Sequence, residues 1–289
     1  MADEITWSGL EGKYGYDYRL LQESLVSALY PANNLLQFLA QKSLAGFASD
    51  SERFPKEPTL AATSLTDGTD MSNTAYSPSQ VTLTVGEVGL MLTLTDLART
   101  SSFADISMYG TGAGKAVAKK LTGDIAALGA GFSSSVGTTT ANLTEAQFLS
   151  AKTTLLLADV MEDYFAVLYP QQLDDLIADT GTTIVALTTS GTDVRSQAND
   201  LSNNQSYDFG RFHGVSVVTN TQVPTANAGA DSAGFMAARG AALAYVEKWG
   251  VRVEMERDAS LRAQEVVVTA AYAVGEIDDN RGVGIITDR

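Results

Sequence analysis

The string GTGAGK at residues 110–115 is the part of this sequence that most resembles a site for chemistry. Glycines ahead of a helix let backbone amides approach a phosphate, which a lysine can then neutralise. The spacing fits neither common version of the motif. A P-loop ending in Gly114 and Lys115 needs glycine at Tyr109 and serine or threonine at Ala116, and a dinucleotide fingerprint needs glycine at Lys115. We therefore expect a flexible lead-in to a helix and no nucleotide site.

A serine nucleophile is the second candidate, at ADSAG (residues 230–234). A nucleophile elbow needs a buried strand before the serine and a helix after it, whereas the loop-like string TANAGA precedes this one. The only candidate base is His213, at the mouth of a strand, where a packed or solvated turn residue is the commoner role. The chain has no cysteine, which excludes disulfides, thiolate nucleophiles and Cys/His zinc sites. A soluble hydrolase or binding domain stays a remote alternative.

Carboxylates gather in three places, and each grouping could hold an acid/base pair or a hard cation. Each also has a structural explanation: the first turn of a helix, the solvent side of a strand, and a turn. No calcium-loop spacing is present, so we expect no resident metal, although a weak divalent-ion site at a subunit contact stays open. The three groups are Asp174–Asp175, Glu254 with Glu256 and Asp258, and Asp278–Asp279.

The net charge of −15 argues against sequence-specific DNA binding and against anionic membranes, and it predicts salt-dependent association between copies. Lys115, Lys119 and Lys120 form the one basic cluster of note. They are expected on the polar side of a helix, where they are either a solvated face or a contact for DNA phosphates or another subunit. No secretory signal and no membrane-spanning segment is expected.

The elements that must position these residues follow from the spacing of apolar side chains. Residues 1–52 show two short helical patterns split by Pro31 and predict an extended arm. Residues 54–80 are rich in proline, glycine and small polar residues, which predicts a long exposed excursion. Period-two alternation then predicts strands at 81–85 and 88–94.

Three helices and several strands are expected in the middle of the chain. Apolar residues from Val117 to Leu128 form the stripe of a long helix. Thr144 and Gln147 make a capping-box pattern ahead of a second helix, and Pro170 opens a short third one. A Ser/Thr/Gly linker is expected at 133–141 and strands at 164–169, 184–187 and 215–219.

The last 40 residues predict a half-exposed antiparallel sheet. VRVEMER (251–257) alternates apolar and charged residues, EVVVTAAYAV (265–274) continues as a long strand, and 282–287 adds a short one. No fixed-period repeat is present, and the helices and strands are mixed. The predicted fold class is therefore α+β.

Taken in order, these pieces resemble the fold shared by tailed-phage major capsid proteins, encapsulins and the floor of herpesvirus capsids. The resemblance spans nearly the whole chain and depends on the order of the segments more than on any one of them. The strings that carry it are VTLTVGEVGLMLTLTDLA, DYFAVLYPQQLDDLIAD, FGRFHGVSVVTNTQVP and GFMAARGAALAYVEKWGVRVEMERD.

The resemblance implies a division of the chain into named regions. It implies a 1–52 N-terminal arm, a 53–92 E-loop, a 93–141 P-domain with the spine helix, a 142–244 A-domain, 245–279 P-domain strands, and a 280–289 C-terminal strand returning to the A-domain.

The resemblance also implies a function: a structural shell subunit and not an enzyme, with no cofactor. Many copies would assemble as hexamers and pentamers into an icosahedral phage head, in the virion, after assembly in the host bacterial cytoplasm. Expected partners are a portal, separate scaffolding or decoration proteins, and packaged double-stranded DNA in non-specific contact. A polar loop such as 59–80 is costly to order in a monomer, which fits a chain completed by its neighbours.

Two features differ from some members of the family. We expect no fused scaffolding segment, because only about 50 residues precede the E-loop, and the resemblance then implies a separate scaffolding protein or none. Covalent crosslinking through lysine and asparagine is not expected, because Lys56 is the only E-loop lysine and Asn280 is a nominal partner. An encapsulin-type cellular nanocompartment, with a cargo enzyme in place of a genome, remains the main alternative.

Overall fold

The computed structural model describes residues 35–56, 60, 62–68, 70–71, 73, 76–97, 106–187 and 210–289. The helical pattern that was expected before residue 35 lies outside them. In chain order the elements are η1 (Leu36–Phe38), β1 (Ala40–Ser43), β2 (Ser51–Lys56), β3 (Ser79–Thr84), β4 (Gly86–Thr95), α3 (Ile106–Gly129), β5 (Ser135–Val136), α4 (Glu145–Leu157), β6 (Tyr164–Leu168), α5 (Pro170–Leu187), β7 (Gly210–Phe212), β8 (Val215–Thr219), β9 (Thr225–Ala226), η2 (Asn227–Gly229), β10 (Asp231–Ala238), β11 (Leu243–Asp258), β12 (Ala263–Glu276), η3 (Asp279–Arg281) and β13 (Gly282–Asp288).

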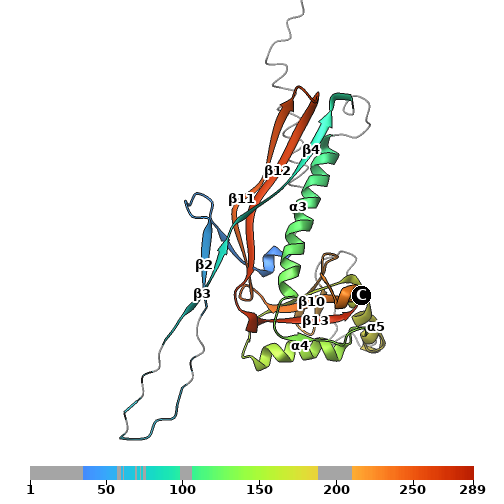
Figure 1. Ribbon diagram of the computed structural model, residues 1–289. Coiled ribbons are helices and arrows are strands. Elements are labelled where there is room, and N and C mark those ends of the chain that lie inside the picture. Colours follow the sequence, from blue (N-terminus) through green and yellow to red (C-terminus); the bar gives the residue numbers. More distant parts are fainter. Residues whose placement is uncertain are drawn as a thin grey trace, which may run out of the picture.

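A long sheet in the order β1-β11-β12-β4 forms the elongated part of the molecule, and α3 runs along one face of it (Figure 1). The antiparallel hairpin β11–β12 is the predicted one, and its alternation holds: Val253 is buried while Arg252 and Glu254 are exposed. Val117 and Leu121 of α3 pack with Val266 and Val268 of β12 in one hydrophobic cluster. The apolar residues that recur every second position on the strands thus pack against those that recur every 3.6 positions on the helix, and both sets are buried in one interface.

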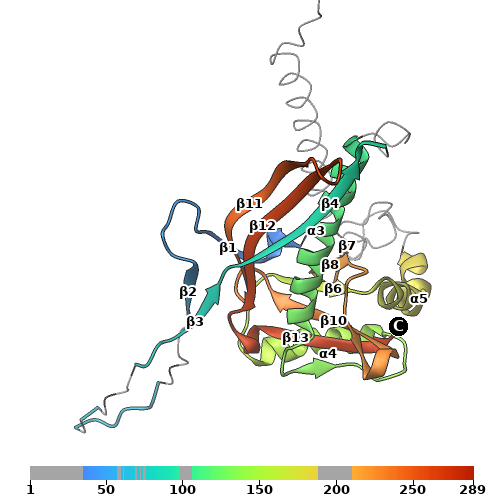
Figure 2. The same cartoon turned by 45° about the horizontal axis from the view of Figure 1, so that its top comes forward.

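A second sheet, in the order β5-β13-β10-β6-β8-β7 with β9 beside β10, forms the compact part of the molecule. The foot of α3 packs near β10 and β13, and α4 and α5 pack on the β13 side (Figures 1 and 2). β6 is buried along its whole length, which explains its unbroken apolar run. The predicted capping box is present, since Thr144 Oγ1 accepts from the Gln147 amide and Gln147 Oε1 accepts from the Thr144 amide.

The ribbon β2–β3 is a separate two-stranded sheet that projects from the body (Figure 1). Its strands pair antiparallel from Ser51 opposite Thr84 to Lys56 opposite Ser79. Phe54 and Leu83 pack with Ala244 at the base of β11 in a third hydrophobic cluster. The residues between the strands are those expected to form the exposed excursion, and those described are exposed from Leu60 to Pro78.

Three local expectations were wrong. The glycine-rich string 110–115 lies inside α3, because burial of one helix face outweighs the low helix propensity of glycine. Residues 184–187 continue α5 and form no strand, a known ambiguity of short apolar runs. The 133–141 linker contains β5, which pairs in parallel with β13.

The strand β10 was not predicted at all. It is buried along its whole length, and its small residues give no alternating pattern. The helix α3 approaches it closely at Gly129, where an added Cβ would lie 1.9 Å from Cδ1 of Phe235. Phe235 lies opposite Val167 of β6 and so at the centre of the second sheet. Helix and sheet therefore meet at a contact that only glycine permits.

Candidate assembly and nucleic-acid surfaces

The three lysines form a basic strip on the exposed side of α3. Lys115, Lys119 and Lys120 are all exposed, and Val117 and Leu121 are buried on the opposite side. Spacings of four and five residues place the three ammonium groups on one side of the helix. On a chain with a net charge of −15, this strip can contact a polyanion or the carboxylates of another subunit.

One end of this strip is fixed to the sheet by hydrogen bonds. Lys120 Nζ lies 2.6 Å from Asp124 Oδ1, and the hydroxyl of Tyr272 donates to Asp124 Oδ2 at 2.9 Å. Burial, with a further contribution from Asp124, raises the pKa of Tyr272, so this hydroxyl remains a donor. Lys120 therefore has part of its charge balanced within the chain.

The candidates for catalysis do not form a catalytic site. Ser232 is fully buried within β10, and no helix follows it, so the nucleophile elbow is absent from this strand. His213 lies in the β7–β8 turn with φ of +49°, and its Nε2 is 2.6 Å from Oε1 of Glu145. Lys152 donates to the carbonyl oxygen of His213 at 2.7 Å. The histidine thus joins a turn to the start of α4.

At least one carboxylate in each of the three acidic groups accepts local hydrogen bonds. Asp175 accepts hydrogen bonds from the side chains of Asn142 and Gln171. The prediction that Asp174 and Asp175 lie in the first turn of a helix was wrong, because α5 begins at Pro170 and both residues lie beyond that turn. Asp258 accepts from Ser260 and from the Leu261 amide in the β11–β12 turn, and these bonds lower its pKa. Within the described residues, no three Asp, Glu or His side chains gather as a metal site needs.

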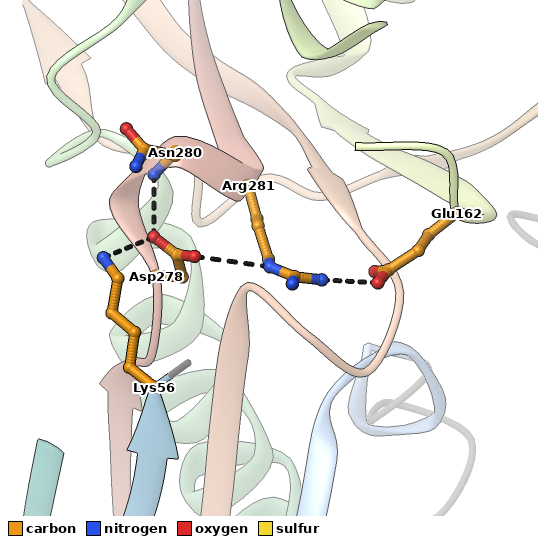
Figure 3. A network of polar contacts seen from close by, with 5 residues as sticks. All are labelled: Lys56, Glu162, Asp278, Asn280 and Arg281. Atoms are coloured by element: carbon orange, nitrogen blue, oxygen red, sulfur yellow. Dashed lines mark hydrogen bonds and ion pairs between the residues drawn. The ribbon is translucent and has the colours of Figure 1, made fainter. Parts of the chain in front are cut away.

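An ion-pair network joins the projecting ribbon to the body (Figure 3). Lys56, at the last pair of the ribbon, lies 2.6 Å from Asp278 Oδ1 in the turn between β12 and β13. Asp278 Oδ2 accepts from Arg281 Nε at 3.3 Å, and Arg281 also pairs with Glu162 in the loop after α4. Three segments that are distant in sequence therefore meet where the excursion leaves the body.

Lys56 and Asn280, the two residues considered for crosslinking, both take part in this network, but each of them contacts Asp278. The backbone amide of Asn280 donates to Asp278 at 3.2 Å, while its side-chain amide points away from Lys56 (Figure 3). Lys56 directs its ammonium group to Asp278 instead. Within one chain, this geometry uses both residues to hold the turn and the ribbon together.

Sequence reasoning missed this network and two surfaces beside it. One is a groove at the base of the ribbon, with a volume of about 560 Å³. The other is the exposed end of α4, where Leu157 is 81% and Met161 80% exposed. Of these two surfaces, only the exposed end of α4 has a sequence signal, which is the leucines at the end of its amphipathic pattern. The groove has none, because it is formed by residues from several distant segments. Among the described residues, no helix combines the length and apolar character of a membrane crossing.

Comparison with known proteins gives matches in structure alone. No family model and no curated protein matches the chain. The head structure of Helicobacter pylori bacteriophage KHP40 aligns with a TM-score of 0.65 and 10% identity over 86% of this chain and 88% of that one. The Mycobacterium phage Che8 structure gives 0.63 and 18% over 84% and 87%. A virus-like particle from Pyrococcus furiosus gives 0.60 and 12% over 93% and 98%.

These matches cover most of each chain and show a shared fold. The chain therefore has the fold of phage capsid subunits, and the predicted α+β class and the predicted capsid fold are confirmed. At identities of 10–18%, the likeness identifies the architecture and leaves the roles of individual residues to the geometry described above.

Proposed function

We propose that this chain is the major capsid protein of a tailed bacteriophage, a subunit that self-assembles into the shell around double-stranded DNA. The observation that carries the proposal is the match over most of the chain to assembled phage capsids. The β2–β3 ribbon and its exposed excursion support it, because a projecting segment that buries little of its own surface is suited to packing on a neighbour.

The regions take the roles that the resemblance implied. The excursion and its strands, residues 53–92, form the E-loop, and residues 93–141 with 245–279 form the P-domain around α3. Residues 142–244 form the A-domain, and residues 280–289 return to it. The contact between β13 and β10 supports the last assignment, because Asp231–Ala237 pairs with Gly282–Asp288.

The expressed protein tests this function directly. Size-exclusion chromatography and negative-stain microscopy across a range of salt concentrations should reveal shells, sheets or capsomers, with assembly favoured where salt screens the charge of −15. Deleting residues 60–78 should leave the circular dichroism of the protomer nearly unchanged and block or misdirect assembly. A 30.5 kDa monomer at every salt concentration would refute the proposal.

The lysine strip is proposed as a non-specific contact to packaged DNA. Replacing Lys115 and Lys119 by glutamine should reduce the salt sensitivity of DNA held by assembled particles, because each lost phosphate contact removes roughly 0.9 from the logarithmic salt slope. The matched control replaces Lys248 and Arg252, whose side chains belong to β11. Equal slopes for the two variants would exclude this role.

An encapsulin-type nanocompartment is the second candidate, supported by the match to the Pyrococcus furiosus particle. The two functions differ in content, a genome against a cargo enzyme. Gene neighbourhood separates them: adjacent terminase and portal genes support the phage head, while an adjacent ferritin-like or peroxidase gene supports the compartment. Under either function the chain acts as a shell subunit, with portal, scaffolding and decoration proteins as further partners of the phage head.

A further inference from the structure

The strand β4 forms one edge of the long sheet and is ten residues long (Figure 1). Within the described part of the chain it pairs with β12 alone, and no other backbone hydrogen bond there involves residues 86–94. Every second residue of such an edge strand directs its N–H and C=O away from the sheet. These groups can therefore pair with the backbone of another strand.

The burial of the β4 side chains shows that this edge is open. In the hydrophobic cluster that lies against α3, Val266 and Val268 of the neighbouring β12 are 1% and 0% exposed. The β4 residues that pack against the same cluster, at positions 88, 90, 92 and 94, are only partly buried. On the other face of the strand, Met91 is 58% exposed. A further strand alongside β4 would cover both sets of side chains.

The opposite edge of the sheet has the protection that β4 lacks. Beyond the part covered by β1, the strand β11 has two irregularities in its pairing with β12, and charged residues occupy six of positions 248–258. Irregular pairing and charged side chains are usual means of keeping a free strand edge from associating. β4 has regular pairing throughout, one charged residue, Glu87, and no proline. It is therefore the edge of this sheet that is suited to a partner strand.

We infer that β4 of one copy pairs antiparallel with β4 of a second copy, around a two-fold axis at Met91. The strand suits a copy of itself because its edge is nearly neutral, in a chain whose net charge of −15 repels other copies elsewhere. In this register Glu87 lies roughly 27 Å from Glu87 of the second copy, because eight residues at about 3.4 Å each separate them. The two Met91 side chains, each largely exposed in one copy, cover each other at the axis.

Pairing of this kind is isologous, because both copies use the same strand. Subunits within a hexamer or pentamer meet through heterologous contacts, whereas a two-fold contact joins two copies and closes on itself. The β4 pair would therefore connect one ring of subunits to the next. The inference rests on the proposed function, because it says how such rings are held together in a shell.

Disulfide trapping tests the contact, because the natural chain has no cysteine. In the inferred pair the two Met91 Cα atoms lie about 4.5–5.5 Å apart, which a disulfide can span. Particles of Met91→Cys, oxidised after assembly, should therefore contain a reducible covalent dimer. The matched control is Thr93→Cys, which is exposed on the same face of β4. Its two copies would lie roughly 14 Å apart and should give no dimer.

A charged substitution gives a second, independent readout. Met91→Lys places two ammonium groups opposite each other at the axis, and like charges in that position destabilise strand pairing. It should raise the subunit concentration needed for assembly about tenfold, with the urea midpoint of the unassembled protein unchanged. The added lysine also reduces the net negative charge of each copy, which by itself would favour assembly. Met91→Leu keeps an apolar side chain at the axis and is the control, which should assemble normally.

The outcomes separate the inference from the proposed function. Particles without the Met91–Met91 link, a Thr93→Cys variant that links equally well, or a Met91→Lys variant that assembles as Met91→Leu does, would each overturn the inference alone. A natural chain that forms no particles would remove the proposed function and the inference together.

Discussion

Replacing Asp278 tests how the ribbon is fastened to the body. The Asp278 side chain is 15% exposed, pairs with Lys56 and Arg281, and caps η3 through the Asn280 amide. Asp278→Ala removes these contacts and leaves two cations without this partner. We expect the free energy of unfolding to fall by about 2–3 kcal/mol: roughly 1 kcal/mol for the cap and about 0.5–1 kcal/mol for each partly exposed ion pair.

Thermal and urea unfolding at pH 7 measure this loss. A fall of that size corresponds to a decrease in Tm of roughly 4–10 °C for a chain of this length. The control is Glu52→Gln, which breaks the ion pair with Lys42 on the same ribbon, where the two side chains are 28% and 42% exposed. That pair is more open to solvent, so the control should lose less than about 1 kcal/mol.

The pH dependence gives the prediction a second test. Burial raises the pKa of Asp278, but hydrogen bonds from Lys56, the Asn280 amide and Arg281 lower it more, so the net shift is downward. A carboxyl group whose pKa is lower in the folded than in the unfolded protein contributes its full stabilisation of the fold above its unfolded pKa, about 3.9. That contribution is lost as the pH falls through the folded pKa. The difference between natural chain and Asp278→Ala should be constant near neutrality and shrink below about pH 4. A variant as stable as Glu52→Gln, or a difference that grows in acid, would refute this reasoning.

Further predictions concern two helices and one strand, all measured by chemical or thermal unfolding. Gly112→Ala in α3 should stabilise by up to about 1 kcal/mol, because the position has open space and a helical backbone. Gly129→Ala should destabilise by about 3 kcal/mol or more through its clash with Phe235. Thr144→Ala should cost about 1 kcal/mol by removing the α4 cap. Burial and nearby carboxylates raise the pKa of Glu276, so Glu276→Gln should raise Tm at pH 7, with no gain below about pH 4.

The Gly112→Ala variant also tests whether residues 110–115 are helical, as in the structure, or a flexible lead-in, as predicted from the sequence. If residues 110–115 were a flexible lead-in, Gly112→Ala would be neutral or destabilising. The effects of replacing Asp278 and Glu276 should both fade below about pH 4, but they have opposite signs at pH 7. Asp278→Ala should be less stable than the natural chain and Glu276→Gln more stable, because the folded pKa of Asp278 is lowered and that of Glu276 is raised. Stability changes of the same sign at pH 7 would contradict one of these two pKa directions.

The sequence predicts those helices and strands in which the spacing of apolar residues reflects which of their faces is buried. The β11–β12 hairpin alternates because one face packs on α3 and the other meets water. The start of α4 is predictable because Thr144 and Gln147 carry the whole cap locally. β6 is predictable because it is buried on both faces. In each case the signal lies within a few neighbouring residues.

The remaining elements depend on contacts that are distant in the chain. The small residues of β10 have no period, and only its position between β13 and β6 makes it a strand. The residues 184–187 have an apolar run that fits a strand as well as a helix, and α5 simply continues through them. The lysine side of α3 was predictable from helical spacing, but the glycines before it were read as a lead-in.

The candidate surfaces divide in the same way. The exposure of Lys115, Lys119 and Lys120 can be predicted from the spacing of residues within one helix. The network of Lys56, Asp278 and Glu162 cannot, because it joins residues more than 100 positions apart. The groove beside it exists only once the ribbon, β1 and the β12–β13 turn have packed. No local pattern encodes such a site.

We expect folding and assembly to depend on different parts of this chain. Among the described residues, hydrophobic clusters lie between α3 and both large sheets, on the α4 side of the second sheet, and at the root of the ribbon. The large apolar side chains that are exposed lie mainly outside these clusters, on projecting parts. Substitutions at such positions should therefore change association while leaving protomer stability within about 0.5 kcal/mol, and core substitutions should do the reverse. The exposed set is Phe47, Leu60, Leu65, Met71, Tyr76, Met91, Leu97, Leu156, Leu157, Met161 and Leu261.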